Sequence, residues 1–328
     1  MSLKLFALMA LLILVSGLGA YYAVQTQVSV QPPEARTVVI APGTSTQGIA
    51  RKLEEEGVIR SALMFRLLAR LRGDAQELQS GEYHFVEPAK LSKVLQRLRR
   101  GDVLLHRLTV AEGLRNDEIL LLLAGQTQTP LALWQEAFQK MLGERKIDGE
   151  GEGYLLPETY TYRLPVDAHA VLLDMLRAQH ALMQTLLPAW QGAQGLRIVA
   201  SIVEKETAMD AERPLVAAVI RNRLERRMAL QMDPTVIYGL WHEDGNFSGN
   251  LHKGDLKRDT PWNSYTRKGL PLTPICNPGA ASLRAAADPA DVDYLYFVAD
   301  GSGGHAFAST LEEHNANVRR WMKFERNR

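Results

Sequence analysis

The sequence predicts an α+β protein with an N-terminal transmembrane helix, a small β-α-α-β domain and a larger α+β domain. Residues 5–24 are almost continuously apolar, residues 37–105 alternate between strand-like and helix-like patterns, and residues 154–328 combine several helical patterns with a strand-rich end. The chain has 328 residues, of which 46% are hydrophobic and 23% charged, so it is long enough for two folded domains and an anchor.

The N-terminal segment, residues 1–24, is expected to be an anchor. No charged residue lies between Lys4 and Glu34, and about 20 apolar residues in a helix cross a hydrocarbon core of roughly 30 Å. The alternative is a cleaved signal peptide, whose apolar region is shorter and ends in a small-x-small site; the Gly-Leu-Gly of residues 17–19 matches that site poorly. The position of Lys4 before the apolar run indicates that the rest of the chain is exported.

A polar linker with two adjacent prolines, residues 25–36, leads to the small domain, residues 37–105. Its first segment, TVVIAPGTSTQGIARKL, predicts a strand, a turn with a helix cap at Ser45, and a helix. The segment resembles the start of a LysM-type glycan-binding module. Residues 106–153 form a connecting region with a similar strand-turn-helix pattern, interpreted either as a second LysM-like half or as a chance repetition. A plain spacer is the alternative for both.

Composition excludes several classes of function. There are 38 Lys+Arg against 37 Asp+Glu, and no basic block is interleaved with aromatic residues, so we expect no nucleic-acid partner. Cys276 is the single cysteine, so no intrachain disulfide can form. The eight histidines lack metal-ligand spacing, and no phosphate-binding or serine-nucleophile motif occurs, so we expect no metal and no cofactor. The glycines of residues 301–304 predict a hairpin in preference to a phosphate cradle.

The strongest chemical signal lies in a helix predicted over residues 196–210. At about 100° per residue, Glu206 falls within the apolar stripe of this helix and Glu204 on the opposite, wet face. The stripe consists of Ile198, Val199, Ile202, Val203 and Met209. Apolar surroundings raise the pKa of a carboxyl group, which is what a general acid for glycosidic cleavage requires. The alternative is a buried glutamate paired with an arginine, for which Arg213, Arg221 or Arg223 could serve.

Four blocks carry a resemblance to a known family: ASIVEKETAMDAERPLVAAVIRNRL, LQMDPTVIYGL, NSYTRKGLPLTPICNPG and YLYFVADGSGGHAF. Together with the earlier EGYLLPETYTY, they resemble the endolytic murein transglycosylases, the MltG or YceG-like family. The resemblance implies that residues 154–328 form a catalytic domain with a lysozyme-like active-site helix, in which Glu206 is the catalytic residue. It also implies a lyase that cleaves the MurNAc-GlcNAc β-1,4 bond of nascent peptidoglycan and leaves 1,6-anhydro-MurNAc ends.

The resemblance also suggests residues that bind substrate: Gln231, Asp233, Tyr238, Asn263, Tyr265 and Glu158. For Asp233, a helix cap or turn before Pro234 is the alternative. Glu158 stands where the family usually has Asp, which puts a direct contact in doubt. The implied partners are glycan strands, the bacterial inner membrane with the catalytic domain on its periplasmic side, and peptidoglycan synthases.

Two alternatives to a lytic transglycosylase belong to other classes of protein. One is a non-catalytic peptidoglycan-binding scaffold of the cell-wall synthesis machinery. The other is a hydrolase, which needs a second carboxylate about 5–10 Å from Glu206 to act as nucleophile or to activate water.

Overall fold

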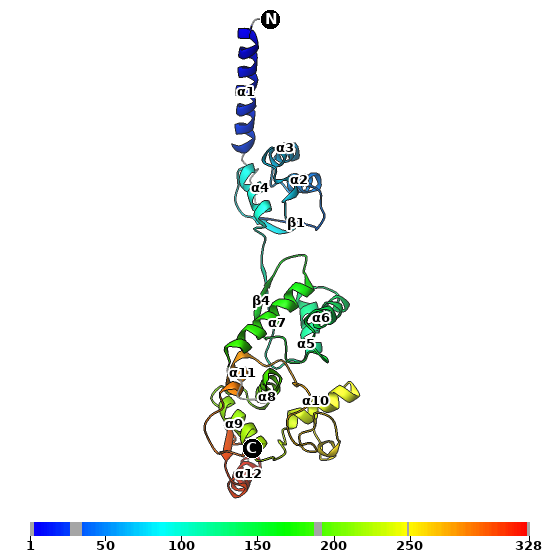
Figure 1. Cartoon of the computed structure of the whole chain (residues 1–328), viewed down its shortest axis with the longest axis vertical. Helices are drawn as coiled ribbons and strands as arrows, with labels where there is room; N and C mark the ends of the chain where they lie inside the picture. Colours follow the sequence, from blue (N-terminus) through cyan, green and yellow to red (C-terminus); the bar gives the residue numbers. More distant parts are fainter. Residues whose placement is uncertain (1–2, 27–34, 187–191, 248, 327–328) are drawn as a thin grey trace. The chain divides into compact units, whose positions relative to one another are not determined.

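The structure, a computed structural model, describes residues 3–26, 35–186, 192–247 and 249–326. It contains both helices and short antiparallel strand pairs, which confirms the predicted mixture of α and β (Figure 1). Contacts divide the chain into two units. Unit 1 comprises residues 1–107 and 161–167, and unit 2 comprises residues 108–160 and 168–328. The division falls within β3 (His106–Thr109) and β4 (Thr159–Tyr162), which pair with each other.

The other elements of unit 1 are α1 (Leu3–Thr26), β1 (Arg36–Ile40), α2 (Thr46–Glu55), α3 (Ala62–Arg72), η1 (Asp74–Gln76), β2 (Gly81–Phe85) and α4 (Leu91–Arg100). Those of unit 2 are α5 (Asn116–Thr127), α6 (Leu131–Arg145), α7 (Ala168–Thr185), α8 (Gly192–Glu206), α9 (Arg213–Glu225), α10 (Asp233–Asp244), η2 (Asp255–Lys257), α11 (Ala280–Ala287), β5 (Tyr296–Ala299), β6 (His305–Ala308) and α12 (Leu311–Arg326).

The predicted β-α-α-β order is present in unit 1. Strands β1 and β2 are antiparallel, with Val38 opposite Tyr83, and their inward side chains pack with α2, α3 and α4 in one apolar core. Helix α2 begins after Ser45, whose hydroxyl accepts a hydrogen bond from the N–H of Gly48 at 3.2 Å, so the predicted cap is confirmed. The likeness of this unit to LysM modules stays a prediction.

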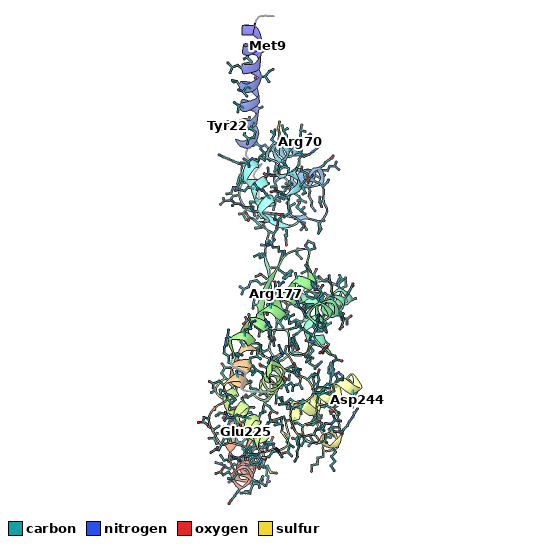
Figure 2. The ribbon with its side chains drawn as sticks, in the orientation of Figure 1. Met9, Tyr22, Arg70, Arg177, Glu225 and Asp244 are labelled. Atoms are coloured by element: carbon teal, nitrogen blue, oxygen red, sulfur yellow. The ribbon has the colours of Figure 1, made fainter. Side chains whose placement is uncertain are left out.

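The predicted anchor coincides with α1, a helix of 24 residues. Apolar side chains along it are exposed, among them Met9 at 50% and Tyr22 at 70% (Figure 2). Within the described parts of the chain, no helix combines the length and the apolar character needed to cross a membrane. Of the predicted linker, residues 27–34 lie outside the described residues.

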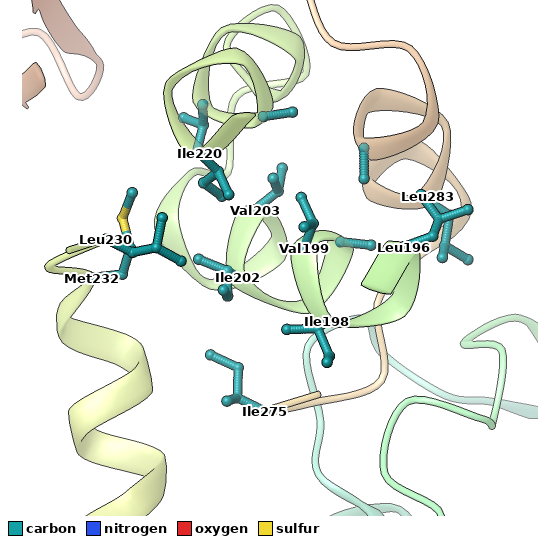
Figure 3. Close-up of a cluster of buried hydrophobic side chains, with 14 of the residues drawn as sticks. Leu196, Ile198, Val199, Ile202, Val203, Ile220, Leu230, Met232, Ile275 and Leu283 are labelled. Atoms are coloured by element: carbon teal, nitrogen blue, oxygen red, sulfur yellow. The ribbon is translucent and has the colours of Figure 1, made fainter. Parts of the chain in front are cut away.

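Unit 2 is built around α8. Residues 195–203 of this helix are all buried, and α9, α10 and α11 contact it. Figure 3 shows Val199, Ile202 and Val203 of α8 among side chains from several other segments of the unit. A helix that is covered on all sides in this way has no wet face along its buried part. Its position is therefore set by packing along residues 195–203.

The strand-rich end of the chain is a hairpin. Strands β5 and β6 are antiparallel, and Ala299 lies opposite His305 across the connecting turn. The glycines of this turn include Gly301 and Gly303, both with positive φ, which suits a tight reversal of the chain. The hairpin interpretation of this glycine-rich segment is therefore confirmed.

Candidate active site

Glu206 is the last residue of α8 and is only partly exposed. The sequence predicts a helix as far as residue 210, but the structure ends it at Glu206. Burial of the carboxyl group raises its pKa from 4.5 to about 8, and the negative charge of Asp233 adds to the rise. Because low polarity and a like charge both disfavour ionisation, this carboxyl group holds a proton at neutral pH.

Glu206 lines a cavity of about 210 Å³ within unit 2. The other lining residues are Arg223, Leu230, Gln231, Met232, Asp233, Tyr265 and Phe297. They come from α9, the segment before α10, the start of α10, the loop after η2, and β5. Three of the predicted site residues, Gln231, Asp233 and Tyr265, thus share one cavity with Glu206.

Two of the three arginines proposed as partners of Glu206 are engaged elsewhere. Arg213 pairs with Asp210, and Arg221 donates to the carbonyl oxygen of Ala290 at 3.0 Å. Over the residues that the structure describes, no ion pair joins either arginine to Glu206.

Arg223 does line the cavity, but its guanidinium group is committed to main-chain oxygens. It donates to the carbonyl oxygens of Leu295 and Leu230, each at 2.7 Å, and to the Gln231 side chain at 3.3 Å. No described hydrogen bond or ion pair connects it to Glu206. The alternative of a structural glutamate–arginine pair at Glu206 is therefore wrong.

The prediction that Glu204 lies on a wet face is also wrong. Its side chain is only 6% exposed, lies 3.8 Å from Arg213, and accepts a hydrogen bond from the N–H of Gly279 at 2.9 Å. The wheel argument assumed a surface helix with one apolar stripe, whereas α8 is covered on all sides. Glu204 therefore joins α8 to the start of α11 and does not line the cavity around Glu206.

Asp233 and Tyr265 form a polar pair in the cavity. The Tyr265 hydroxyl donates to the Asp233 carboxylate at 2.5 Å. Burial raises the pKa of Tyr265, and the bond to Asp233 adds to the rise, so the phenol keeps its proton. Helix α10 begins at Asp233, with Met232 in the capping position, so Asp233 does not cap the helix as the alternative expected. The partner of its carboxylate is the phenol of Tyr265.

Gln231 reaches the cavity through an unusual main-chain conformation. Its φ of 54° lies in the left-handed region, which non-glycine residues seldom adopt. Its N–H donates to the carbonyl oxygen of Ser264 at 3.1 Å, and its side-chain oxygen accepts from Arg223. These bonds fix an exposed amide beside the carboxyl group of Glu206.

Asn263 is not available to a sugar. It is 0% exposed, and its side-chain amide donates to the carbonyl oxygens of Leu256 and Arg258 at 3.2 and 2.7 Å. Its side-chain oxygen accepts from the N–H groups of Tyr265 and Thr266. The predicted direct contact is therefore wrong, because this side chain shapes the loop that carries Tyr265.

Tyr238 and Glu158 also lie outside the lining of the cavity around Glu206. Tyr238 is 4% exposed, packs against Trp262, and donates to the buried carboxylate of Glu152 at 3.4 Å. The predicted contact of Tyr238 with substrate is wrong for this cavity, since the side chain belongs to the core. Glu158 is exposed, and its carbonyl oxygen accepts from the N–H of Val110.

A hydrogen-bonded network next to Glu206 was not expected from the sequence. The Glu212 carboxylate accepts from the Thr207 hydroxyl at 2.9 Å and from the N–H and the ring of His305, each at 2.7 Å. Burial alone would raise the pKa of Glu212, but these hydrogen bonds outweigh it and hold the pKa below its usual value. The His305 ring meets Phe297, which lines the cavity, edge to face at 5.2 Å. Glu212 therefore ties the residue after Glu206 to the hairpin.

No metal site accompanies this arrangement: in the described part of the chain, no group of three or more His, Cys, Asp or Glu side chains is placed to hold an ion. What the cavity offers is a proton-bearing carboxyl group, a second carboxylate, a phenol and an amide. These groups can transfer a proton to a polar substrate and hydrogen-bond to it.

The chain is similar to several known proteins. The model of the YceG-like family matches residues 38–320. A Bacillus subtilis protein named endolytic murein transglycosylase is 31% identical over 299 residues, which is 84% of this chain and 82% of the relative. A Streptococcus pneumoniae protein of the same name is 28% identical over 325 residues, 86% of this chain but 57% of the relative. The crystal structure of a yceG-like protein from Listeria monocytogenes, 30% identical, superposes with a TM-score of 0.55 and covers 86% of this chain and 99% of that one.

The raised pKa of Glu206 predicts how stability depends on pH. Between pH 4.5 and about 8, the folded protein keeps a proton on Glu206 that the unfolded chain has lost, so the stability of the fold decreases as the pH rises through this range. Glu206→Gln removes this penalty. The variant should gain melting temperature over wild type, with a larger gain at about pH 9 than at about pH 5. The exposed Glu225→Gln is the matched control, and an equal gain at both pH values would contradict the assignment.

Proposed function

The chain belongs to the YceG-like family, and on that premise we propose that it is an endolytic lytic transglycosylase that cuts the glycan strands of peptidoglycan. The observation that carries the proposal is the carboxyl group of Glu206, which has a pKa of about 8, lines a cavity and lacks an arginine partner among the described residues. The relatives named endolytic murein transglycosylase support the same substrate and reaction class.

The reaction needs one proton carrier. Glu206 donates its proton to the glycosidic oxygen between N-acetylmuramic acid and N-acetylglucosamine, and the bond from C1 of the muramic acid to that oxygen breaks. The resulting carboxylate takes the proton from the C6 hydroxyl group of the muramic acid. The C6 oxygen then bonds to C1, which closes a 1,6-anhydro ring and returns Glu206 to its protonated form. No water is consumed.

The neighbours of Glu206 have separate roles in this proposal. The negative charge of Asp233 disfavours ionisation of Glu206 before the reaction and favours the positive charge that develops at C1 during it. Tyr265 holds Asp233 in place. The exposed amide of Gln231 is the group that we assign to hydrogen bonding with the sugar.

The two alternatives meet different objections. A hydrolase needs a second carboxylate, and Asp233 shares the cavity, so the products must distinguish hydrolysis from transglycosylation. A non-catalytic scaffold has no use for a partly buried carboxyl group without a hydrogen-bonded partner, because burying such a group costs stability.

Product analysis tests the reaction. Full-length protein incubated with uncrosslinked glycan strands should release fragments that end in 1,6-anhydro-muramic acid, which mass spectrometry separates from reducing ends by the mass of one water. Glu206→Gln should lose roughly 10²- to 10⁴-fold in rate, the usual contribution of a general acid. Glu225→Gln, an exposed change on the same unit, should keep the wild-type rate (Figure 2). Reducing ends would make the protein a hydrolase.

The rate should also report the protonation state of Glu206. The first step needs the protonated carboxyl group. Titration of Glu206 should therefore leave kcat/KM independent of pH in the neutral range and lower it as the pH rises through about 8. Asp233→Asn removes the like charge that raises the pKa of Glu206, so the falling limb should move to lower pH. A limb unchanged by this variant would count against the cavity electrostatics described above.

We further propose that residues 1–24 hold the chain at the bacterial inner membrane as a single-pass anchor, with the catalytic unit on the periplasmic side. The uncharged run between Lys4 and Glu34 supports this location, as do the exposed apolar side chains of α1. The substrate of the proposed reaction lies on that side of the membrane.

Fractionation tests the location. The full chain should sediment with membranes, resist a high-salt wash and dissolve in detergent. A chain that starts at Arg36 should remain in the supernatant and still unfold cooperatively on heating, with a helical signal reduced by the loss of α1. A full chain found in the supernatant would refute the anchor without touching the proposed reaction.

A further inference from the structure

A second cavity in unit 2, with a volume of about 750 Å³, is rich in positive charge. It lies among the C-terminal end of α6, the middle of α7 and the first turns of α8. Arg145, Lys146, Arg177 and Arg197 line it, against the single carboxylate of Asp148 (Figure 2 labels Arg177). Its lining excludes Glu206, so it is separate from the catalytic cavity.

Arg197 is the unusual member of this lining. It is 7% exposed, and its Nε atom has no hydrogen-bond partner among the described residues. Its guanidinium group lies 4.0 Å from the centre of the Tyr154 ring and contacts Gln179 at 3.5 Å, the limit of a hydrogen bond. Burial lowers the pKa of Arg197, which shows that its charge is poorly solvated. A buried cation that is not paired with a carboxylate is costly, so an anion bound beside Arg197 would relieve that cost.

The rest of the lining indicates what carries that anion. The exposed side chains of Gln184 and Gln194 present amide groups, and Ile147 and Leu176 add apolar surface. Gln179 is buried, and its amide donates to the carbonyl oxygen of Gly153. A cavity of this volume is within the range that holds a small organic molecule, and it is larger than a lone phosphate ion needs. Guanidinium groups bind carboxylates through two parallel hydrogen bonds. Amides beside such a group match the main chain of a short peptide.

We propose that this cavity binds the free carboxylate of a short peptide. Resting on the proposed function, we identify that peptide with those that branch from the peptidoglycan strand. Arg197 receives the carboxylate at the bottom of the cavity, and Lys146 and Arg177 at its exposed rim attract it.

The geometry of α8 defines the relation of this site to the catalytic one. Arg197 and Glu206 are nine residues apart, which is about 14 Å along the helix axis and half a turn around it. The two side chains therefore leave the helix on opposite sides. A peptide bound at Arg197 belongs to a part of the glycan other than the bond being cut, or to a second strand. The site acts on affinity for the strand and leaves the chemical step unchanged.

Titration calorimetry on the full chain in detergent tests the proposal with three probes. These are the disaccharide tetrapeptide released from bacterial cell walls, the same compound with its carboxylates converted to methylamides, and inorganic phosphate. The acid form should bind at least tenfold more tightly than the methylamide, because conversion to the methylamide removes the negative charge that would pair with Arg197. Lys146→Ala should weaken binding of the acid form at least threefold, and Arg197→Gln at least tenfold. Arg319→Ala, at an exposed position, should leave the affinity unchanged.

Lys146 is exposed, so its variant keeps the test valid even if Arg197→Gln fails to fold. Equal affinity for the acid and the methylamide would overturn the proposal, as would absence of binding by the acid form. Binding of phosphate alone would overturn the peptide assignment. If the protein still produces anhydro ends but fails any of these binding tests, only the peptide site is refuted. If it binds the peptide but produces no anhydro ends, the proposed function is refuted instead.

Discussion

The burial of α8 is the constraint on which the rest of unit 2 depends. Residues 195–203 are enclosed by other helices, so the direction and the end point of the helix are fixed by packing over most of its length. The same enclosure strips water from the carboxyl group of Glu206 at the end of the helix. One set of apolar contacts therefore provides both the position and the proton affinity of the catalytic candidate, which is why no dedicated partner for that carboxyl group is required.

Polar networks then fix the lining around this end point. Glu212 joins Thr207 to His305 and so connects the end of α8 to the hairpin that supplies Phe297. On the other side of the cavity, the bond from Tyr265 to Asp233 joins a loop to the start of α10. Each wall is thus held by a carboxylate that is already hydrogen-bonded, while Glu206 is left free to exchange its proton.

The sequence was sufficient to predict the apolar surroundings of the Glu206 carboxyl group, the β-α-α-β order and the hairpin, because each rests on local periodicity or turn chemistry. It misplaced Glu204, since a wheel drawn for a surface helix cannot know that a helix is enclosed. It assigned Asn263 to the substrate from its place in a family block, although its four hydrogen bonds serve the loop. The importance of Arg197 is not visible in the sequence, because its contacts, Tyr154 and Gln179, are distant along the chain.

Glu206 occupies the C-terminal end of α8, where the aligned peptide dipoles present their negative pole. Such a pole repels a carboxylate and attracts a cation. In the reaction that we propose, the backbone itself therefore favours a proton on Glu206 before the bond breaks and the positively charged sugar carbon while the bond is breaking. The dipole of one helix thus favours both the neutral carboxylic acid at the start of the proposed reaction and the transient cation on the sugar that follows.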